Sequence, residues 1–216
     1  MKYSHVIWDF NGTIIDDVAL GVEVFNELRG DCGLPPVAKS EYVENFKIPV
    51  RDFYEDSGFD FSKFDFRKIG EKFARLYGAR RFECPLTFGF ERAARALSEA
   101  GVGQSVLSAY ENGLLNEALR HYGLEKFFSR IDGLDNIDAG SKKELGARHA
   151  ASLKIPPEKI VMVGDTPHDK EVADAMGAAC ALVACGHASR RRLEKLGVPV
   201  FENPAEFMEA FFGGGL

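Results

Sequence analysis

Two short segments contain acidic and amide residues whose spacing suits chemistry on a phosphate group. Asp9 and Asn11 lie two residues apart in WDFNGT, and Asp165 and Asp169 lie four apart in GDTPHD. Carboxylates that share one site need a cation, because like charges repel. A set of oxygen ligands without cysteine or histidine favours a hard ion, and we expect Mg²⁺.

Two further segments carry groups that could hold phosphoryl oxygens. Ser108 ends the run QSVLS, and Ser141, Lys142 and Lys143 precede a helical pattern. A lysine, a hydroxyl and backbone amides beside glycine are suitable phosphate ligands. Taken singly, Ser108 could cap a helix and Lys142 could be a surface lysine. The interpretation therefore depends on whether the fold brings these residues together.

Alternating strand and helix patterns provide such a fold. Short apolar runs predict strands at 4–9, 104–108, 159–165, 179–184 and 198–201, with a weaker candidate at 130–133. Helical patterns lie between them at 90–100, 111–122, 142–153, 169–176 and 189–196. This alternation predicts an α/β fold, a Rossmann-like parallel sheet with helices on both faces. Ligands of such sheets bind beyond the carboxyl ends of the strands, so the polar residues should share one edge.

The segment 17–84 interrupts this alternation. It contains helical patterns at 18–29, 39–46, 50–56 and 66–80, much of the chain's phenylalanine and no convincing inner strand. We interpret it as a small inserted α-helical cap domain, which leaves 1–16 and 85–216 as the α/β core domain. The phenylalanines are expected to fill the core of the cap, because so small a domain needs large side chains.

Composition excludes several classes of protein. The formal net charge of -6 argues against a nucleic-acid binder, which needs a basic surface. The apolar runs are too short to span a membrane, and the N-terminus shows no secretion signal. The four cysteines have no metal-binding spacing, so we expect reduced thiols and a cytoplasmic location. The oligomeric state, monomer or weak dimer, stays open.

The four segments, in order, resemble the motifs of the haloacid dehalogenase superfamily. WDFNGT resembles its DxDGT motif, VLSAY its strand-terminal serine or threonine, Lys142 its lone lysine, and GDTPHD its GDxxxD motif. The resemblance spans Asp9 to Asp169, and the helical insertion lies where many members carry a cap. It implies a Mg²⁺-dependent hydrolase of small phosphomonoesters, closest to the phosphoglycolate phosphatase-like and sugar-phosphate enzymes.

The resemblance also implies catalytic and metal-binding roles. Asp9 would attack phosphorus and form an aspartyl-phosphate. Asp9 and Asp165 would bind the metal through their side chains, and Asn11 through its backbone carbonyl. Asp169 would support the metal, directly or through water.

The phosphate-binding roles fall on four residues. Ser108 and Lys142 would hold the phosphoryl oxygens, with Lys142 also neutralising charge beside the nucleophile. Ala109 would contribute beside Ser108, and Gly12 would shape the turn after the nucleophile. Lys143 is the alternative to Lys142 if the register shifts by one residue.

Asn11 departs from the family pattern, which has an aspartate there as general acid and base. An amide can perform neither role, and positioned acid–base catalysis contributes roughly 10²–10⁴-fold. Three hypotheses follow: substrates with good leaving groups, a substitute residue such as His168 or a cap residue, or a phosphometabolite-binding protein with little turnover. Deamidation of Asn11 before Gly12 would restore an aspartate. A dinucleotide-binding protein is a weaker rival, because no GxGxxG follows the first strand.

Overall fold

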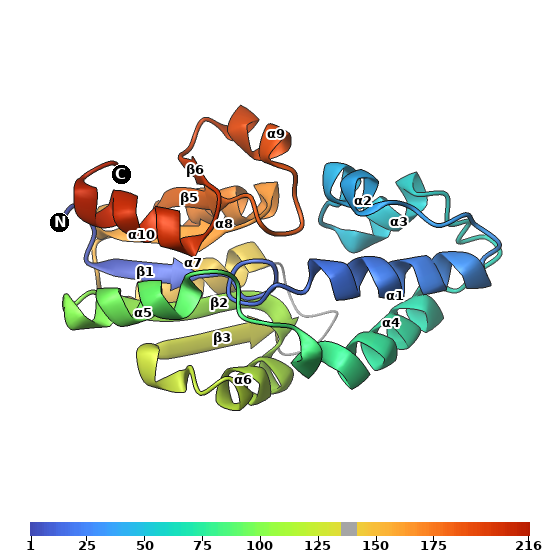
Figure 1. Cartoon of the computed structure of the whole chain (residues 1–216), viewed down its shortest axis with the longest axis horizontal. Helices are drawn as coiled ribbons and strands as arrows, with labels where there is room; N and C mark the ends of the chain where they lie inside the picture. Colours follow the sequence, from blue (N-terminus) through green and yellow to red (C-terminus); the bar gives the residue numbers. More distant parts are fainter. Residues whose placement is uncertain (135–141) are drawn as a thin grey trace.

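The computed structural model describes residues 1–134 and 142–216, which form a parallel sheet and a neighbouring group of helices (Figure 1). The sheet has six strands in the order β3-β2-β1-β4-β5-β6, and every pairing is parallel. The strands are β1 His5–Trp8, β2 Gly103–Glu111, β3 Arg130–Leu134, β4 Ile160–Gly164, β5 Ala179–Val183 and β6 Val200–Phe201. The predicted α/β class is confirmed.

The strand order explains why the polar residues meet. The chain runs from β1 outward to β3, and then returns to the other side of β1 for β4. Trp8, the last residue of β1, lies beside Val106 of β2 and Val163 of β4. The residues after β1 and β4 therefore leave the same edge, where the strand order reverses and where ligands bind in such sheets.

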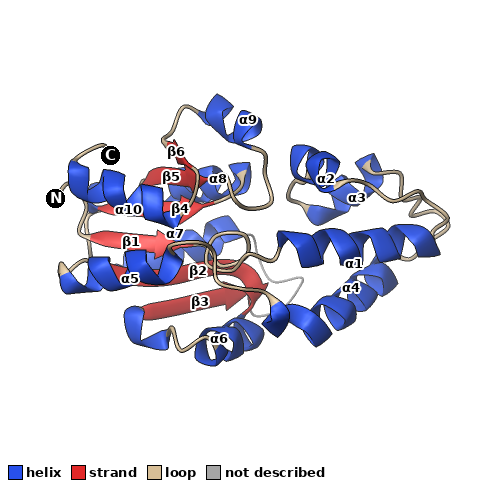
Figure 2. Cartoon of the chain, viewed as in Figure 1, coloured by secondary structure: helices blue, strands red, loops and turns tan. Residues whose placement is uncertain are grey.

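Helices cover both faces of the sheet, as predicted (Figure 2). Side chains of β1 alternate between the faces, with Val6 and Trp8 in one apolar cluster and Ile7 in the other. The first cluster includes α5 Phe90–Glu99, α6 Asn112–His121 and α10 Pro204–Gly213. The second includes α7 Lys142–Leu153, α8 Pro167–Met176 and α9 Arg190–Leu193.

The central strand is anchored by its tryptophan, which the alternation predicts to be buried. Trp8 is fully buried, and its indole packs edge-on against Phe90 and Phe207 at 5.2 and 5.4 Å. Its Nε1 donates to Gln104 Oε1 at 3.0 Å, so the indole N–H keeps a partner inside the core. Phe207 belongs to α10, a helix that the sequence analysis did not predict.

Four helices lie beyond the carboxyl ends of the strands (Figure 1). They are α1 Val18–Asp31, α2 Lys39–Asn45, α3 Val50–Asp56 and α4 Phe66–Arg80. Phe25 and Phe53 stack at 4.8 Å in an apolar cluster of the cap helices and their loops. The phenylalanines thus form the interior of the cap, as expected. The domain boundaries 17–84 and 85–216 stay predictions.

The cap also contacts the core through the segment after β5. Ser189 donates from its backbone N to Val43 O at 3.0 Å and from Oγ to Glu44 Oε2 at 2.7 Å. Arg191 pairs with Glu44, and Arg192 Nη1 donates to Val43 O at 3.0 Å. Two members of the arginine run 190–192 therefore bind the cap.

Some element boundaries differ from the prediction. Strand β2 continues to Glu111, three residues beyond Ser108, through a register shift against β3. Helix α8 begins at Pro167 rather than at Asp169, because proline suits the first helical turn. The helix predicted at 189–196 is shorter, with a 3₁₀ turn from Glu194 to Leu196. Within 1–134 and 142–216, the helices are too short or too polar to cross a membrane.

Candidate active site

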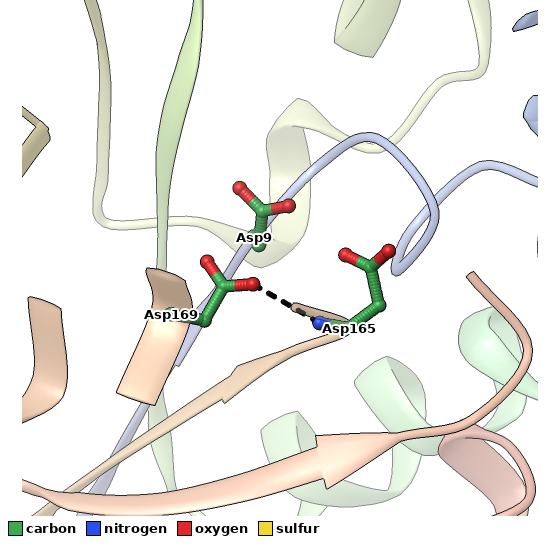
Figure 3. A group of neighbouring side chains, drawn as sticks. All are labelled: Asp9, Asp165 and Asp169. Carbon is green, nitrogen blue, oxygen red and sulfur yellow. Dashed lines mark hydrogen bonds between the residues drawn. The ribbon is translucent and has the colours of Figure 1, made fainter. Parts of the chain in front are cut away.

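Asp9 lies immediately after β1 and is held at the edge of the sheet. Its backbone N donates to Val163 O of β4 at 2.8 Å, and its side chain is almost fully buried. Asp165 occupies the equivalent place after β4, and Asp169 lies in the first turn of α8. The three side chains point toward one another, and an oxygen of each lies within 4.8 Å of the others (Figure 3).

The start of α8 fixes Asp169 by a capping box. Asp169 Oδ2 accepts from Thr166 Oγ1 at 2.7 Å, from Thr166 N at 3.0 Å and from Asp165 N at 3.1 Å. This oxygen therefore caps the helix, in line with the preference for acidic groups at helix N-termini. The other oxygen, Oδ1, turns to the cluster and accepts from Lys142. Asp169 thus caps α8 with one oxygen and faces the acidic cluster with the other.

Lys142 is the cation of this cluster. It begins α7, and its Nζ donates to Asp9 Oδ1 at 2.5 Å and to Asp169 Oδ1 at 2.6 Å. Burial alone would lower the pKa of Lys142, but the two carboxylates hold it above its ordinary value. Lys143 instead pairs with Glu171 at the surface. The geometry therefore favours Lys142 over the alternative. Ser141 lies outside the described residues.

The acidic cluster has a chemistry that suits a divalent cation. Burial raises the pKa of Asp9 to about 6, against the opposing effect of Lys142. Burial raises the pKa of Asp165 to about 8, although His187 opposes it. A cation among these oxygens would favour the ionised carboxylates, and Mg²⁺ prefers such oxygen ligands. The buried aspartates thus form a candidate metal site, with Asp9 and Asp165 as the side chains that would hold the ion.

Asn11 is fixed between the core and the cap. Its Nδ2 donates to Asp17 Oδ2 at 2.7 Å and to the hydroxyl of Tyr77, on α4, at 2.8 Å. The Tyr77 hydroxyl in turn donates to Asp17 Oδ2 at 2.8 Å. An ionised carboxylate can only accept hydrogen bonds, so the amide nitrogen of Asn11 must face Asp17. Both N–H groups of the Asn11 amide, at the position where the family pattern has an acid, therefore donate hydrogen bonds within the protein.

Asp17 and His187 form a buried ion pair beside Asn11. Asp17 lies before α1, yet it makes no side-chain cap bond with that helix; its Oδ1 accepts from Gly12 N at 2.8 Å and from His187 Nε2 at 3.2 Å. Burial would raise the pKa of Asp17, but His187, Asn11 and Tyr77 lower it. Burial would lower the pKa of His187, but Asp17 and Asp165 raise it to about 9.

Sequence reasoning missed most of this network. His187 was not among the predicted site residues, yet its backbone N donates to Asp165 Oδ2 at 2.5 Å. Asp17 was used only as a boundary, and Tyr77 was not considered. The available signal in the sequence was that Asp17 stands directly before a helix. An acidic residue there suggests a helix cap, but the Asp17 side chain makes no cap bond with α1.

The predicted phosphate-binding residues lie near this edge with different degrees of exposure. Ser108 is buried, and its Oγ accepts from Tyr110 N at 3.1 Å, whereas Ala109 is exposed. Gly12 has a φ of +70°, and an added Cβ would lie 2.3 Å from Asp165 Oδ2. Only glycine suits this position, because the turn approaches the acidic cluster so closely.

His168 lies at the start of α8, away from the Asn11 network. Its Nδ1 is 3.3 Å from Glu171 Oε2, and burial together with Lys142 lowers its pKa. No contact with Asn11 or Asp17 connects His168 to the missing acid within the described residues. Its role as a substitute therefore stays a hypothesis from the sequence.

The chain is similar in sequence and in fold to known proteins. Tyrosine-protein kinase PtkA of Mycobacterium tuberculosis is 27% identical over 206 residues, covering 94% of this chain and 70% of PtkA. A phosphoglycolate phosphatase of Neisseria meningitidis is 27% identical over 197 residues, covering 88% and 84%. The crystal structure of a predicted phosphatase from Clostridium acetobutylicum has the same fold, with a TM-score of 0.82 and 18% identity over 99% of this chain and 100% of that one.

A sequence model of the haloacid dehalogenase-like hydrolases matches residues 6–183. The matched region includes β1, the helical insertion, α7 and the start of α8, so it carries every residue of the acidic cluster and its lysine. Because this match extends over most of the chain, the protein belongs to the haloacid dehalogenase-like hydrolase family.

Proposed function

We propose that this chain is a Mg²⁺-dependent phosphohydrolase that acts on small phosphorylated metabolites through an aspartyl-phosphate on Asp9. Similarity to phosphoglycolate phosphatases supports a phosphomonoester as substrate. The observation that carries the proposal is the buried contact of Lys142 with both Asp9 and Asp169, beside Asp165. A cationic and acidic arrangement of this kind, open to a metal, suits in-line phosphoryl transfer.

Each residue of the cluster has a distinct task in this mechanism. Lys142 orients the Asp9 carboxylate through Oδ1 and neutralises charge as a phosphate dianion approaches. Asp9 attacks phosphorus, and water later releases the phosphate. Mg²⁺, when bound by Asp9, Asp165 and the Asn11 carbonyl, supplies Lewis-acid stabilisation of the phosphoryl oxygens. Asp169 keeps Lys142 in place through its second contact.

The phosphoryl oxygens would be held at the ends of β1 and β2. Ser108 offers a buried hydroxyl and Ala109 a backbone amide beside it, while Gly12, whose amide is bonded to Asp17 Oδ1, shapes the turn after the nucleophile. The cap helices over this edge would exclude water from the bound substrate. We also propose that the protein is cytoplasmic and acts on soluble metabolites rather than on nucleic acid or membranes.

A second candidate function is a catalytically weak protein that binds phosphometabolites. The observation that favours it is Asn11, whose amide nitrogen is committed to Asp17 and Tyr77 and cannot act as an acid or base. The buried Lys142–Asp9 contact favours the enzyme, because binding alone does not need an oriented nucleophile.

Hydrolysis of para-nitrophenyl phosphate and a panel of natural phosphates, with Mg²⁺ and with chelator, separates the two candidates. We expect Mg²⁺-dependent turnover in the wild type, loss of turnover in Asp9→Asn, and unchanged turnover in the matched control Asp174→Asn, whose exposed carboxylate pairs with Lys170. Peptide mapping of the active protein checks that position 11 is still asparagine. Absence of turnover on every substrate, with phosphate binding retained, would support the binding protein instead.

A further inference from the structure

The polar side chains between the nucleophile and the cap form a closed set of hydrogen bonds. Both N–H groups of the Asn11 amide are used, one by Asp17 Oδ2 and one by the Tyr77 oxygen. The Tyr77 proton is also directed to Asp17 Oδ2. Neither Asn11 nor Tyr77 therefore has a proton left for a substrate while this arrangement holds.

Asp17 cannot supply a proton either, because its carboxylate is fully occupied as an acceptor. Oδ2 accepts from Asn11 and Tyr77, and Oδ1 accepts from Gly12 N at 2.8 Å and His187 Nε2 at 3.2 Å. Four donors around one buried carboxylate stabilise it as an anion. A group in this state is a hydrogen-bond acceptor only.

His187 closes the set on the side of α2. Its Nε2 faces Asp17, its Nδ1 lies 3.3 Å from the hydroxyl of Tyr42, and its backbone N is bonded to Asp165. The ring also lies 5.2 Å from the ring of Phe46, so the imidazole is enclosed by the cap. Both ring nitrogens thus have protein partners.

The proposed mechanism would place this network on the side of the leaving group. In-line attack by Asp9 places the leaving oxygen on the far side of the phosphorus atom. The cap helices lie beyond the strand ends from which Asp9 projects, so that side faces α1 and α4 (Figure 1). Asn11 meets Tyr77 of α4 at this boundary. The leaving oxygen would therefore approach Asn11 and Tyr77, whose protons are directed to other protein groups.

We infer that this chain selects monosubstituted phosphates whose leaving oxygen departs as a stable anion, namely acyl phosphates and phosphoanhydrides, over alkyl phosphate esters. The inference rests on the proposed function and narrows its substrate class. An alkoxide needs a proton as it departs, and positioned proton donors contribute roughly 10²–10⁴-fold to such steps. A carboxylate or phosphate leaving group does not need that proton.

Atoms and charges balance without a protein acid. In the first step an oxygen of Asp9 bonds to phosphorus, the bond to the leaving oxygen breaks, and its electron pair departs with the carboxylate or phosphate anion. In the second step water bonds to phosphorus, and the electron pair of the Asp9–phosphorus bond returns to the carboxylate. The protons of the water end on the released phosphate and in solvent.

The second step is also affected, because Asn11 cannot activate the water. The aspartyl-phosphate should therefore accumulate with acidic leaving groups, and the first turnover should be faster than later ones. Consequently kcat reports hydrolysis of the intermediate, whereas kcat/KM reports departure of the leaving group. The two parameters should respond differently to the substrate.

The test is a series of substrates with leaving groups of increasing basicity: acetyl phosphate, para-nitrophenyl phosphate, phenyl phosphate and glycerol phosphate. We expect wild-type kcat/KM to fall steeply along the series, kcat to change little between the first two, and a burst of about one leaving group per chain. The variant Asn11→Asp/Asp17→Asn exchanges amide and carboxylate within the same contact. We expect it to raise kcat/KM for glycerol phosphate roughly 10²–10⁴-fold relative to kcat/KM for acetyl phosphate.

His168→Gln is the matched test of another proton source. We expect it to leave the dependence on leaving-group basicity unchanged, since His168 pairs with Glu171 and, among the described residues, has no hydrogen bond to the Asn11 network. A steeper dependence in His168→Gln would reveal an acid and overturn the inference. Wild-type kcat/KM for glycerol phosphate equal to that for acetyl phosphate would also overturn it. The wild-type series decides the question even if the exchange variant does not fold.

The same experiment separates this inference from the proposed function. Asp9→Asn should lose activity on every substrate. If Asp9→Asn stays active, the proposed nucleophile is wrong, whatever the dependence on the leaving group. If Asp9→Asn is inactive and wild-type kcat/KM is flat along the series, the phosphohydrolase proposal stands and the substrate-class inference fails.

Discussion

The buried carboxyl of Asp165 should couple the stability of the fold to pH and to magnesium. Asp165 is 1% exposed, and burial raises its pKa from 3.8 to about 8. Between these pH values the folded chain holds a proton that the unfolded chain has lost. Stability contributed by this proton is therefore complete at low pH and is lost as the pH rises toward about 8.

The size of the effect follows from one proton. Over each pH unit, the free energy of unfolding falls by about 1.4 kcal/mol for each proton that the folded state holds and the unfolded state lacks. From pH 6.5 to 8, Asp165 alone removes up to about 2 kcal/mol, or about 4–8 °C in Tm for a chain of this length. The pKa of His187 is raised to about 9 in the folded chain, whereas an unfolded histidine loses its proton above about pH 6.5. His187 therefore also lowers the stability of the fold as the pH rises.

Thermal unfolding at several pH values, with chelator and with excess Mg²⁺, measures this coupling. Without metal, we expect Tm to fall from pH 6.5 to 8. With Mg²⁺ we expect the fall to shrink, because a cation replaces the proton among the carboxylates. Asp165→Asn carries no titrating proton, so its Tm should depend less on pH and should gain little from Mg²⁺. Asp174→Asn, at an exposed carboxylate on α8, should behave as the wild type.

Three results would refute this reasoning. A chelated wild type with a constant Tm between pH 6.5 and 8 would mean that Asp165 is ionised in the fold without a metal. An Asp165→Asn variant that keeps the full pH dependence would assign the proton to other groups. Stabilisation of Asp165→Asn by Mg²⁺ equal to that of the wild type would place the metal elsewhere.

Two further predictions concern residues beside this carboxyl. Lys142→Met should lower kcat/KM roughly 10²–10³-fold, the typical cost of losing a preorganised charge at a reacting group, while Lys143→Met should keep wild-type activity. Steady-state assays of the folded variants measure both values. Equal effects of the two substitutions would contradict the assignment of Lys142. Gly12→Ala should lose about 1–3 kcal/mol of stability and most Mg²⁺ binding, because φ is +70° and the new Cβ would meet Asp165 Oδ2 at 2.3 Å. Denaturant unfolding measures the loss of stability, and Mg²⁺-dependent Tm shifts measure the loss of Mg²⁺ binding. Wild-type values in both assays would show that the turn can move.

The sequence was sufficient to predict the core because its information is local and periodic. Apolar runs gave the parallel strands, and the edge rule for such sheets placed Asp9 and Asp165 together. The helices of the cap and α7 were also predicted, since their apolar spacing is regular. The end of β2 was misplaced because Ser108 resembles a strand-terminal residue, whereas backbone pairing with β3 continues to Glu111.

The rest could not be predicted because it depends on contacts between distant residues. Tyr77 lies 66 residues from Asn11, and His187 lies 170 from Asp17, so no local pattern connects them. Helix α10 was not predicted, although its buried residues Phe207, Met208 and Phe211 recur at helical spacing and Phe207 packs against Trp8. The contacts of Tyr77 with Asn11 and of His187 with Asp17 form only when the cap packs against the core in the assembled fold.

The structure makes Asn11 and Asp17 a matched pair rather than two independent residues. An aspartate at position 11, with Asp17 unchanged, would bring two carboxylate groups to the contact that now measures 2.7 Å. Two such groups cannot both be ionised, so one would hold a proton or the contact would break. The amide of Asn11 removes this conflict and leaves Asp17 free to accept from Gly12 and Tyr77. The absence of an acid at position 11 and the hydrogen bond from Asn11 to Tyr77 of the cap are therefore parts of the same arrangement.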